Sequence, residues 1–364
     1  MKALKKTLAL ILACLIVFAL CACGDKQAPA AEGGAPAADA GKPDKVYNLS
    51  FTIHDPATSV KTMLYQEMAD KVAEETNGGL IITIHPSGTL VAGTDVAEGI
   101  LAGSADMGWL YTPFFTNQFP LTEVIQLPLS FGDPYATSMV IKQLYEEYPE
   151  VQAELANYKI LNVYSQPGNL LYTKEPVHVA DDLKGLNIRT SSNVGTTMIG
   201  AWGASVMSYG PGDIYEAMNK NVLDGFTFEY SGVKSFKLNE VSKYATEMPI
   251  MTGPFVTAMN WDSWNKLPAE YQEVLEKYFG WSLAEKFAIL FAEDYAAGKE
   301  LCIETGVEII YPTEEELATF KVAADQFIDE WFKTYSTDGF DAKAYFEYAQ
   351  ELYYKYLPDS PLSK

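Results

Sequence analysis

Two segments of the chain, far apart in the sequence, follow the same plan. Residues 96–110 (VAEGILAGSADMGWL) and 214–230 (IYEAMNKNVLDGFTFEY) each show a short helical pattern, a turn, an aspartate (Asp106 or Asp224) and a strand with aromatic side chains. We interpret them as corresponding parts of two similar α/β halves. Because ligands of open α/β sheets bind outside the carboxyl ends of strands, both halves would direct a strand end toward one crevice. The alternative is coincidence, since helix–turn–strand units are common.

The flanking sequence alternates between strand and helix periodicity. Apolar residues alternate at 47–53, recur at i+4 spacing at 59–76, and form a short run at 80–85, which predicts strand, helix and strand with parallel pairing. A right-handed crossover then follows from chain chirality. The later elements are expected to be one long helix at 268–305, a strand at 307–311, and helices at 313–332 and 344–357.

The N-terminus has the pattern of a secretory signal. Basic residues precede an apolar run at 7–20 that is too short for a comfortable membrane span. The run ends in Leu20-Cys21-Ala22-Cys23, which resembles a bacterial lipoprotein cleavage site and implies that Cys23 is lipidated. The alternative is an ordinary secreted protein cut near Ala22. Residues 24–45 are rich in Ala, Gly and Pro, as in a flexible tether. We therefore expect a signal peptide at 1–22 and a tether at 23–45.

The remaining body, residues 46–364, has the length of two domains. Removal of three signal-peptide lysines from 26 basic residues leaves 23, against 48 acidic residues. This excess of negative charge argues against binding to nucleic acids or to anionic lipid surfaces. Cys302 is the one cysteine of the body, so no disulfide can form within one chain, and we expect Cys302 in the core.

The sequence lacks the signatures of the common enzyme classes. Its three histidines, His54, His85 and His178, are scattered, and no zinc-binding pattern includes them. We find no nucleophile elbow, dinucleotide-binding motif or phosphate-binding loop. The sequence thus predicts neither an enzyme nor a cofactor or metal site.

Arg189 is the only arginine in a chain with 25 lysines. It follows a short apolar strand (186–188) and precedes a polar helix start (190–193). A guanidinium grips a carboxylate through two parallel hydrogen bonds, whereas a lysine offers a point charge. We therefore predict that Arg189 receives a carboxylate. The alternatives are an ion pair with Asp181 or Asp182, or a solvent-exposed strand end.

The stretch DDLKGLNIRTSSNVGTTMIGAWGASVMSYGPGDIYEAMNKNVLDGF (181–226) resembles the signature of the DctP-type solute-binding proteins of TRAP (tripartite ATP-independent periplasmic) transporters. KVAEETNGGLIITIHPSGTL, AGSADMGWLYTPFFTNQFPLTEVIQLP and SFKLNEVSKYATEMP resemble other segments of that family, in the same order. The resemblance spans nearly all of 46–300. It implies a two-lobed α/β fold of the periplasmic-binding-protein type (type II), with a hinged cleft and a long helix that crosses both lobes.

The resemblance also implies ligand-binding residues. In the family, an arginine at the position of Arg189 clamps the ligand carboxylate. The other implied cleft residues are His54, Trp109 and Tyr111 in the first lobe, Phe228 and Glu229 after the second aspartate, and Gln166, Asn169 and Tyr172 near the crossover strand, where many relatives carry a second arginine. Each of these residues also has an interpretation without ligand binding. Trp109, Tyr111 and Phe228 could instead form a core between the lobes. His54 could be a structural residue, and Glu229 could face solvent.

Three departures from the family pattern narrow the ligand. The chain has no second arginine, Asn187 replaces a usual lysine, and Glu229 stands where close relatives tend to have proline. A buried Glu229 would repel a carboxylate unless it is protonated or faces an amine or a hydroxyl. We therefore expect a monocarboxylate with an apolar or aromatic body rather than a dicarboxylate.

The sequence thus predicts a monomeric, lipid-anchored, extracytoplasmic protein that captures an organic acid and delivers it to a TRAP permease. Its expected lobes are 46–166 with 255–294, and 167–254 with 295–364. A ligand sensor for a signalling kinase and a surface hydrolase on the same fold are the alternatives.

Overall fold

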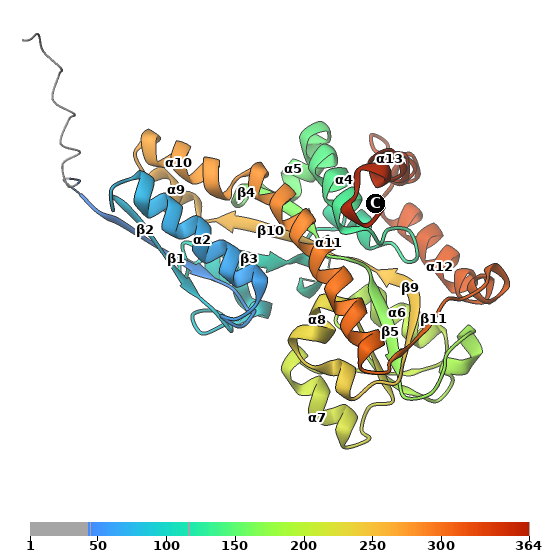
Figure 1. Ribbon diagram of the computed structural model, residues 1–364. Coiled ribbons are helices and arrows are strands. Elements are labelled where there is room, and N and C mark those ends of the chain that lie inside the picture. The colour runs from blue at the N-terminus through green and yellow to red at the C-terminus, as the bar shows by residue number, and fades with distance from the viewer. Residues whose placement is uncertain (1–42, 44, 116, 364) are drawn as a thin grey trace, which may run out of the picture. The chain divides into compact units, whose positions relative to one another are not determined.

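The computed structural model describes residues 43, 45–115 and 117–363. The expected signal peptide, Cys23 and the tether apart from Pro43 and Lys45 lie outside the described residues. Two separate β-sheets organise the described body (Figure 1). Among the described residues, no helix is long and apolar enough to cross a membrane.

The first sheet has five strands. In sheet order they are β2 (Leu80–His85), β1 (Tyr47–Thr52), β3 (Met107–Tyr111), β10 (Pro254–Met259) and β4 (Lys159–Ser165). β1 pairs in parallel with β2 and β3, as the predicted strand–helix–strand unit requires, and β10 runs antiparallel to β3 and β4. The helices of this part of the chain are α2 (Val60–Glu75), α3 (Val96–Leu101), α4 (Pro134–Glu147), α5 (Pro149–Leu155), α9 (Trp261–Asn265) and α10 (Ala269–Phe279).

The second sheet repeats this arrangement. In sheet order its strands are β11 (Glu308–Ile310), β9 (Tyr244–Met251), β5 (Asn169–Thr173), β8 (Gly225–Phe228), β6 (Asn187–Arg189) and β7 (Ser205–Met207). β6 is parallel to β7 and β8, and β5 is antiparallel to β8 and β9. The helices between these strands are α6 (Asn193–Ala201), α7 (Ile214–Asn219) and α8 (Tyr230–Ser235).

The two aspartates of the sequence repeat have the same structural role. Asp106 precedes β3, and its Oδ2 accepts a hydrogen bond of 2.8 Å from the backbone N–H of Ser50 in β1. Asp224 precedes β8, and its Oδ2 accepts a hydrogen bond of 2.8 Å from the backbone N–H of Asn187 in β6. Each aspartate thus fixes a central strand against its parallel neighbour. The sequence repeat corresponds to a repeat in the structure, and coincidence is rejected.

The two sheets exchange strands. β5 follows β4 in the chain but lies in the second sheet, and β10 follows β9 but lies in the first. The two connections contact each other, because Ser165 Oγ and Thr252 Oγ1 are 2.8 Å apart and the N–H of Gln166 donates to the carbonyl of Gly253 over 3.3 Å. Two antiparallel crossings held side by side form a natural hinge between two lobes. The predicted two-lobed α/β fold is confirmed.

Apolar side chains cover both faces of each sheet. Along β3, Trp109 joins the core under α2 and α10, whereas its neighbour Leu110 joins the core under α3, α4 and α5. This alternation is the period of two expected of a strand whose faces are both covered. In the second lobe the core on one face includes Cys302, which is buried as predicted.

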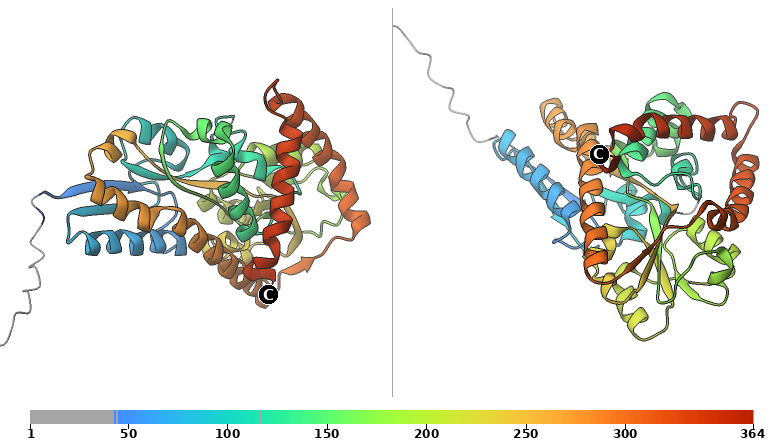
Figure 2. Two further views of the ribbon diagram at one scale, coloured as in Figure 1. Left: turned by 90° about the horizontal axis from the view of Figure 1, so that it is seen from above. Right: turned by 45° about the vertical axis from the view of Figure 1, so that its right-hand side comes forward.

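The long crossing helix is shorter than predicted. The expected single helix at 268–305 is two helices, α10 and α11 (Trp281–Glu304), separated at Gly280. Gly280 has an extended backbone (φ −78°, ψ −159°), and its N–H closes α10 by donating to the carbonyl of Glu276. Periodicity alone could not reveal this break, because apolar spacing continues across it. α11 contacts α4 and β4 in the first lobe and α8 and β11 in the second, so the crossing helix itself is confirmed (Figures 1 and 2).

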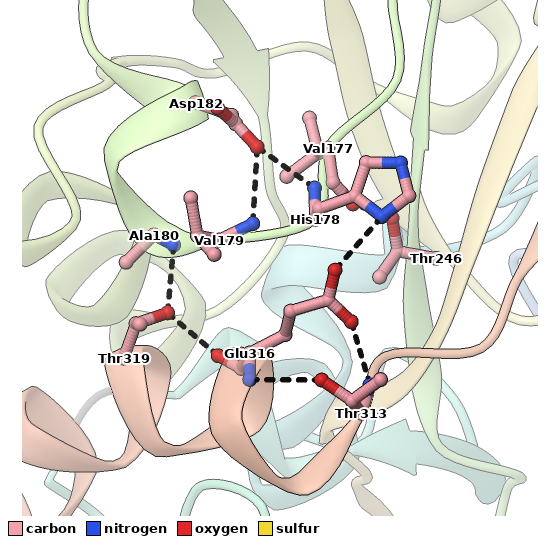
Figure 3. Close-up of polar contacts among 9 residues, drawn as sticks. All are labelled: Val177, His178, Val179, Ala180, Asp182, Thr246, Thr313, Glu316 and Thr319. Atoms are coloured by element: carbon pink, nitrogen blue, oxygen red, sulfur yellow. Dashed lines mark hydrogen bonds and ion pairs between the residues drawn. The ribbon is translucent and has the colours of Figure 1, made fainter.

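The first of the two C-terminal helices packs on both lobes: Phe320 and Ala324 join a core of the second lobe, and Trp331 joins a core of the first. α12 (Glu314–Tyr335) begins at a capping box, in which Thr313 and Glu316 bond each other's backbone N–H groups. The same Glu316 meets His178 of the second lobe over 3.1 Å, and Thr319 Oγ1 accepts from the N–H of Ala180 (Figure 3).

The final helix, α13 (Ala342–Tyr356), instead packs against α4, and its buried side chains share the core beneath β4 and β10. This packing differs from the expectation that 295–364 belong wholly to the second lobe. Sequence periodicity predicts that a helix has an apolar face but not which lobe that face covers.

Replacement of Gly280 by alanine should destabilise the fold. A Cβ at this position would lie 2.1 Å from the carbonyl oxygen of Glu276, a backbone atom that cannot rotate away. We expect the free energy of unfolding to fall by about 1–3 kcal/mol, measured by urea denaturation. Gly339→Ala is the matched control, because nothing lies within 4 Å of its added Cβ. Equal stability of the two variants would contradict this account.

Candidate functional site

A cavity of about 810 Å³ lies between the carboxyl ends of β1 and β3 and those of β6 and β8. Both lobes therefore contribute to its walls. The predicted site residues that line it are His54, Trp109, Tyr111, Gln166, Asn169, Arg189, Phe228 and Glu229.

Arg189 is the sole arginine and lies at the carboxyl end of β6, with 2% of its surface exposed. Its Nε donates to the carbonyl of Tyr209 over 2.9 Å, and its Nη1 donates to the carbonyl of Thr227 over 3.3 Å. Among the described residues it has no ion-pair partner. Burial lowers the pKa of the guanidinium to about 10, which leaves it charged at neutral pH. A buried cation without a counter-ion is costly, so this site is receptive to an anion.

The two alternative interpretations of Arg189 are wrong. Asp181 pairs with Lys184 at the surface, and Asp182 accepts hydrogen bonds from the backbone N–H groups of His178 and Val179 (Figure 3). Neither carboxylate reaches the arginine, and the strand end is not exposed to solvent.

The start of α6 adds to the positive character beside Arg189. Ser192 caps this helix, with its Oγ accepting from the N–H of Gly195 over 2.9 Å. Residues 190–193 line the cavity, so the positive end of the helix dipole faces the same space as the guanidinium.

Aromatic rings form the opposite wall. Trp109 stacks on Phe255 with ring centroids 4.2 Å apart, and on its other side it stacks on His54 at 4.8 Å. Tyr111 packs on Phe255 at 4.7 Å. Trp109 and Tyr111 belong to the first-lobe core and also line the cavity.

Phe228 connects the aromatic wall to the arginine. Its ring centroid lies 5.5 Å from the guanidinium carbon of Arg189. The ring rests against Gly232 in α8, where an added Cβ would lie 1.8 Å from a Phe228 ring atom. A glycine at this position is therefore required for the ring to occupy its place beside Arg189.

Glu229 is buried, with 2% of its surface exposed, so it does not face solvent. It lines the cavity and also caps α8, because Oε2 accepts from the N–H of Gly232 over 2.7 Å and from the hydroxyl of Ser231. Burial raises the pKa of this carboxyl. The helix cap explains why this position can hold a glutamate rather than proline.

Two charged residues of the cavity were missed by sequence reasoning. Lys61 Nζ lies 2.9 Å from Oδ2 of Asp55, and both side chains are 11% exposed. Burial opposes both charges, but their mutual attraction outweighs it: the pKa of Asp55 is lowered and that of Lys61 is raised. Burial also lowers the pKa of the adjacent His54, which favours its neutral form. The sequence repeat could have identified Asp55 as a cavity residue, because Asp55 closely follows β1 and Arg189 ends β6, the corresponding strand of the second lobe.

The residues predicted near the crossover strand do not all line the cavity. Gln166 Nε2 donates to the hydroxyl of Tyr111 over 2.9 Å and to Oδ1 of Asn169 over 3.3 Å, at the cavity wall. Tyr172 does not line the cavity. It is fully buried in the second-lobe core, where it stacks on Phe226 with centroids 5.1 Å apart. The prediction for Tyr172 is wrong because β5 begins at the cavity with Asn169, whereas Tyr172 lies further along the strand, opposite Phe226.

A second, smaller cavity of about 60 Å³ adjoins the first and shares Pro113 and Asn193 with it. Glu123 and Gln126 line it, and Oε1 of each is buried without a hydrogen-bond partner among the described residues. Burial raises the pKa of Glu123 to about 8, and the charge of Glu154 adds to this effect. Glu123 is therefore mainly neutral at pH 7.

The fold and the cleft together define a two-lobed solute-binding protein with a buried guanidinium at its site. The chain belongs to the DctP family, described as bacterial extracellular solute-binding protein, family 7, whose model matches residues 52–334. Members of this family are extracytoplasmic receptors for solutes. The prediction of a DctP-type TRAP solute-binding protein is thereby confirmed.

Three similar proteins illustrate the family. A marine metagenome TRAP solute-binding protein specific for aromatic acid ligands is 25% identical, with a TM-score of 0.79 over 86% of this chain and 99% of that one; it was solved with metahydroxyphenylacetate and with 3-hydroxybenzoate. A TRAP solute-binding protein of Rhodoferax ferrireducens, solved with benzoate, shares the fold at 23% identity and a TM-score of 0.78, over 86% of this chain and 99% of that one. The C4-dicarboxylate-binding periplasmic protein DctP of Rhodobacter capsulatus is 26% identical over 239 residues, 64% of this chain and 67% of that protein.

The raised pKa of Glu123 predicts a loss of stability at alkaline pH. An acid whose folded pKa is raised contributes stability below its unfolded value, near 4.5, and loses it as the pH rises through the folded value, about 8. Since one pKa unit corresponds to about 1.4 kcal/mol, we expect the free energy of unfolding to fall measurably between pH 5 and pH 9.

Glu123→Gln should remove much of this pH dependence, because the amide does not ionise. Urea denaturation of both proteins across this range tests the prediction. Parallel pH profiles of the two proteins would contradict it.

Proposed function

We propose that the protein binds a monocarboxylate with an apolar or aromatic body and delivers it to the membrane subunits of a TRAP transporter. The observation that carries this proposal is the buried guanidinium of Arg189, which has two backbone carbonyl partners and no ion-pair partner among the described residues. A carboxylate would supply both the missing charge and two acceptors for the guanidinium fork.

The preference for one carboxylate rests on the cations of the cavity. Lys61 is a second cation, but Asp55 already holds it. A second ligand carboxylate at Lys61 would approach the carboxylate of Asp55 and the buried carboxyl of Glu229, which would repel it. Arg189 is therefore the one cation available to a carboxylate among the described cavity residues.

The preference for a ring rests on the opposite wall. The rings of Trp109, Phe255 and Tyr111, with Phe228 near the arginine, line the cavity and form an apolar wall against which an aromatic body can pack. The similar metagenome protein, solved with two aromatic acids, agrees with this ligand class.

Ligand binding would also bring the lobes together. The two crossover connections between the sheets act as the hinge, and closure buries the ligand and presents the closed surface to the permease. We propose lobes of 46–166 with 255–294 and α13, and of 167–254 with the segment from 295 to the end of α12. We propose that the protein acts as a monomer.

Replacement of Arg189 by lysine should abolish tight binding. Lysine keeps the charge but loses the planar fork and the two carbonyl contacts that hold it in place. We expect the dissociation constant for 3-hydroxyphenylacetate to rise by about 100-fold, as is usual when one partner of a buried charged contact is lost. Isothermal titration calorimetry measures it, after a thermal-shift screen of organic acids has ranked the ligands.

Lys184→Met is the control for this experiment. It removes a positive charge in the same segment, but Lys184 is exposed and paired with Asp181 outside the cavity. Its affinity should equal that of the wild type. Near-wild-type affinity of Arg189→Lys, with the protein folded, would refute the proposed site.

We also propose that the mature protein is held at the outer face of the membrane by lipid on Cys23. The proposal is supported by the Leu20-Cys21-Ala22-Cys23 sequence after a basic and apolar N-terminal segment. The acidic body would not be attracted to an anionic membrane surface, so a covalent anchor would keep the receptor near its permease.

Cys23→Ser should move the protein from the membrane fraction to the soluble extracytoplasmic fraction or the medium. The thiol that accepts the lipid is lost, whereas the binding lobes are unchanged. Cys21→Ser is the matched control and should remain with the membrane, because the acceptor thiol is intact. Immunoblots of cell fractions measure the distribution. Membrane fractionation of Cys23→Ser would refute the anchor.

A further inference from the structure

The charges of the cavity are unevenly distributed between its two ends. At one end, Arg189 has no carboxylate partner among the described residues. At the other, Asp55 and Glu229 lie around a single cation, Lys61. This second end therefore carries more acidic than basic groups, and it has no part in holding the ligand carboxylate.

Lys61 has N–H donors at this end that its contact with Asp55 does not use. Its Nζ lies 2.9 Å from Asp55 and 5.5 Å from the ring centroids of both Trp109 and Phe291. An ammonium group has three N–H donors, and Asp55 is its one ion-pair partner among the described residues. Because Lys61 lines the cavity, its remaining donors are available to a ligand.

In the other lobe, Glu229 has one carboxyl oxygen, Oε1, that accepts no recorded hydrogen bond. Its Oε2 takes both recorded hydrogen bonds, from Ser231 and from the N–H of Gly232. Among the described residues, no hydrogen bond reaches Oε1. Lys61 and Glu229 line the same cavity from opposite lobes, and the charge of Lys61 lowers the pKa of Glu229 against the effect of burial, yet the two groups form no ion pair. A gap between the lobes therefore separates a free donor from a free acceptor.

We propose that this gap is a second recognition point of the ligand site, which binds a hydroxyl group on the apolar body of the acid between Nζ of Lys61 and Oε1 of Glu229. The hydroxyl oxygen accepts a hydrogen bond from the lysine, and the hydroxyl hydrogen is donated to the glutamate. This inference rests on the proposed function and defines its substrate class as hydroxylated monocarboxylic acids.

A hydroxyl suits this gap better than a charged group. A second carboxylate would be attracted by Lys61 but repelled by Asp55 and Glu229, and it has no proton to donate. An ammonium group would be attracted by the carboxyls but would meet Lys61, which already lies beside Asp55. A hydroxyl is neutral and is both donor and acceptor, so it satisfies both groups without a change of charge.

The test compares four acids on the purified mature protein by isothermal titration calorimetry: phenylacetate, 3-hydroxyphenylacetate, 4-hydroxyphenylacetate and 3-carboxyphenylacetate. One of the hydroxylated acids should bind about tenfold more tightly than phenylacetate, because hydrogen bonds to charged groups are among the stronger ones. The carboxylated acid should bind more weakly than phenylacetate. Equal affinity of phenylacetate and both hydroxylated acids would overturn the inference.

Two variants assign the effect to these residues. In Asp55→Asn/Lys61→Met the buried pair is removed without leaving a lone charge, and the affinity ratio of hydroxylated acid to phenylacetate should fall to near one. In Glu229→Gln the repulsion is removed, and the carboxylated acid should gain affinity relative to phenylacetate. Persistence of the hydroxyl advantage in the double variant, or no gain for the carboxylated acid in Glu229→Gln, would overturn the inference.

The matched control is Lys159→Met/Glu276→Gln. It removes another partly buried ion pair, with atoms 2.6 Å apart, between β4 and α10 but outside the cavity. The affinity ratio should remain at its wild-type value. Failure of all four acids to bind would refute the proposed aromatic-acid function together with this inference, whereas binding that depends on Arg189 but ignores the hydroxyl would refute this inference alone.

Discussion

The buried guanidinium of Arg189 is the constraint on which the cleft depends. Its hydrogen bonds to the carbonyls of Tyr209 and Thr227 fix the fork but supply no counter-charge. A cation removed from water in this way is tolerated when nearby dipoles oppose its charge, and it becomes favourable when an anion arrives. The unliganded site therefore retains part of the cost of burying Arg189, and a ligand carboxylate relieves that cost. The burial of the Arg189 guanidinium is therefore enough to make the site prefer an anionic ligand.

The paired architecture brings the two ends of the cleft together. β1 and β6 occupy corresponding positions in the two sheets, each fixed to its neighbour by an aspartate, Asp106 or Asp224. Their carboxyl ends face one cavity, where β1 leads to Asp55 and β6 ends at Arg189. Because each sheet takes one strand from the other half of the chain, two short connections join the sheets in addition to the crossing helix α11, and rotation about these links would close the lobes.

Sequence reasoning succeeded where a residue's type was itself unusual, and failed where packing decided. A lone arginine and a repeated aspartate are visible in the sequence, and both are central to the structure. The burial of Tyr172 depends on how far along β5 the cavity extends, which strand periodicity leaves open. The break at Gly280 depends on one backbone angle. The position of Asp55 after β1 indicates a cleft residue, but its pairing with Lys61 depends on how the loop after β1 folds onto the start of α2, which the sequence alone does not reveal.

The distribution of contacts between the lobes couples affinity to closure. The carboxylate receptor, Arg189, belongs to the second lobe, whereas the stacked rings of Trp109 and Phe255 and the ammonium of Lys61 belong to the first. A ligand that meets only one set of contacts gains binding energy without drawing the lobes together. A ligand can favour the closed state only by its difference in affinity for the two states. The acids that satisfy both lobes are thus those that close the cleft, so the same contacts that select the solute also determine which solutes are presented to the transporter.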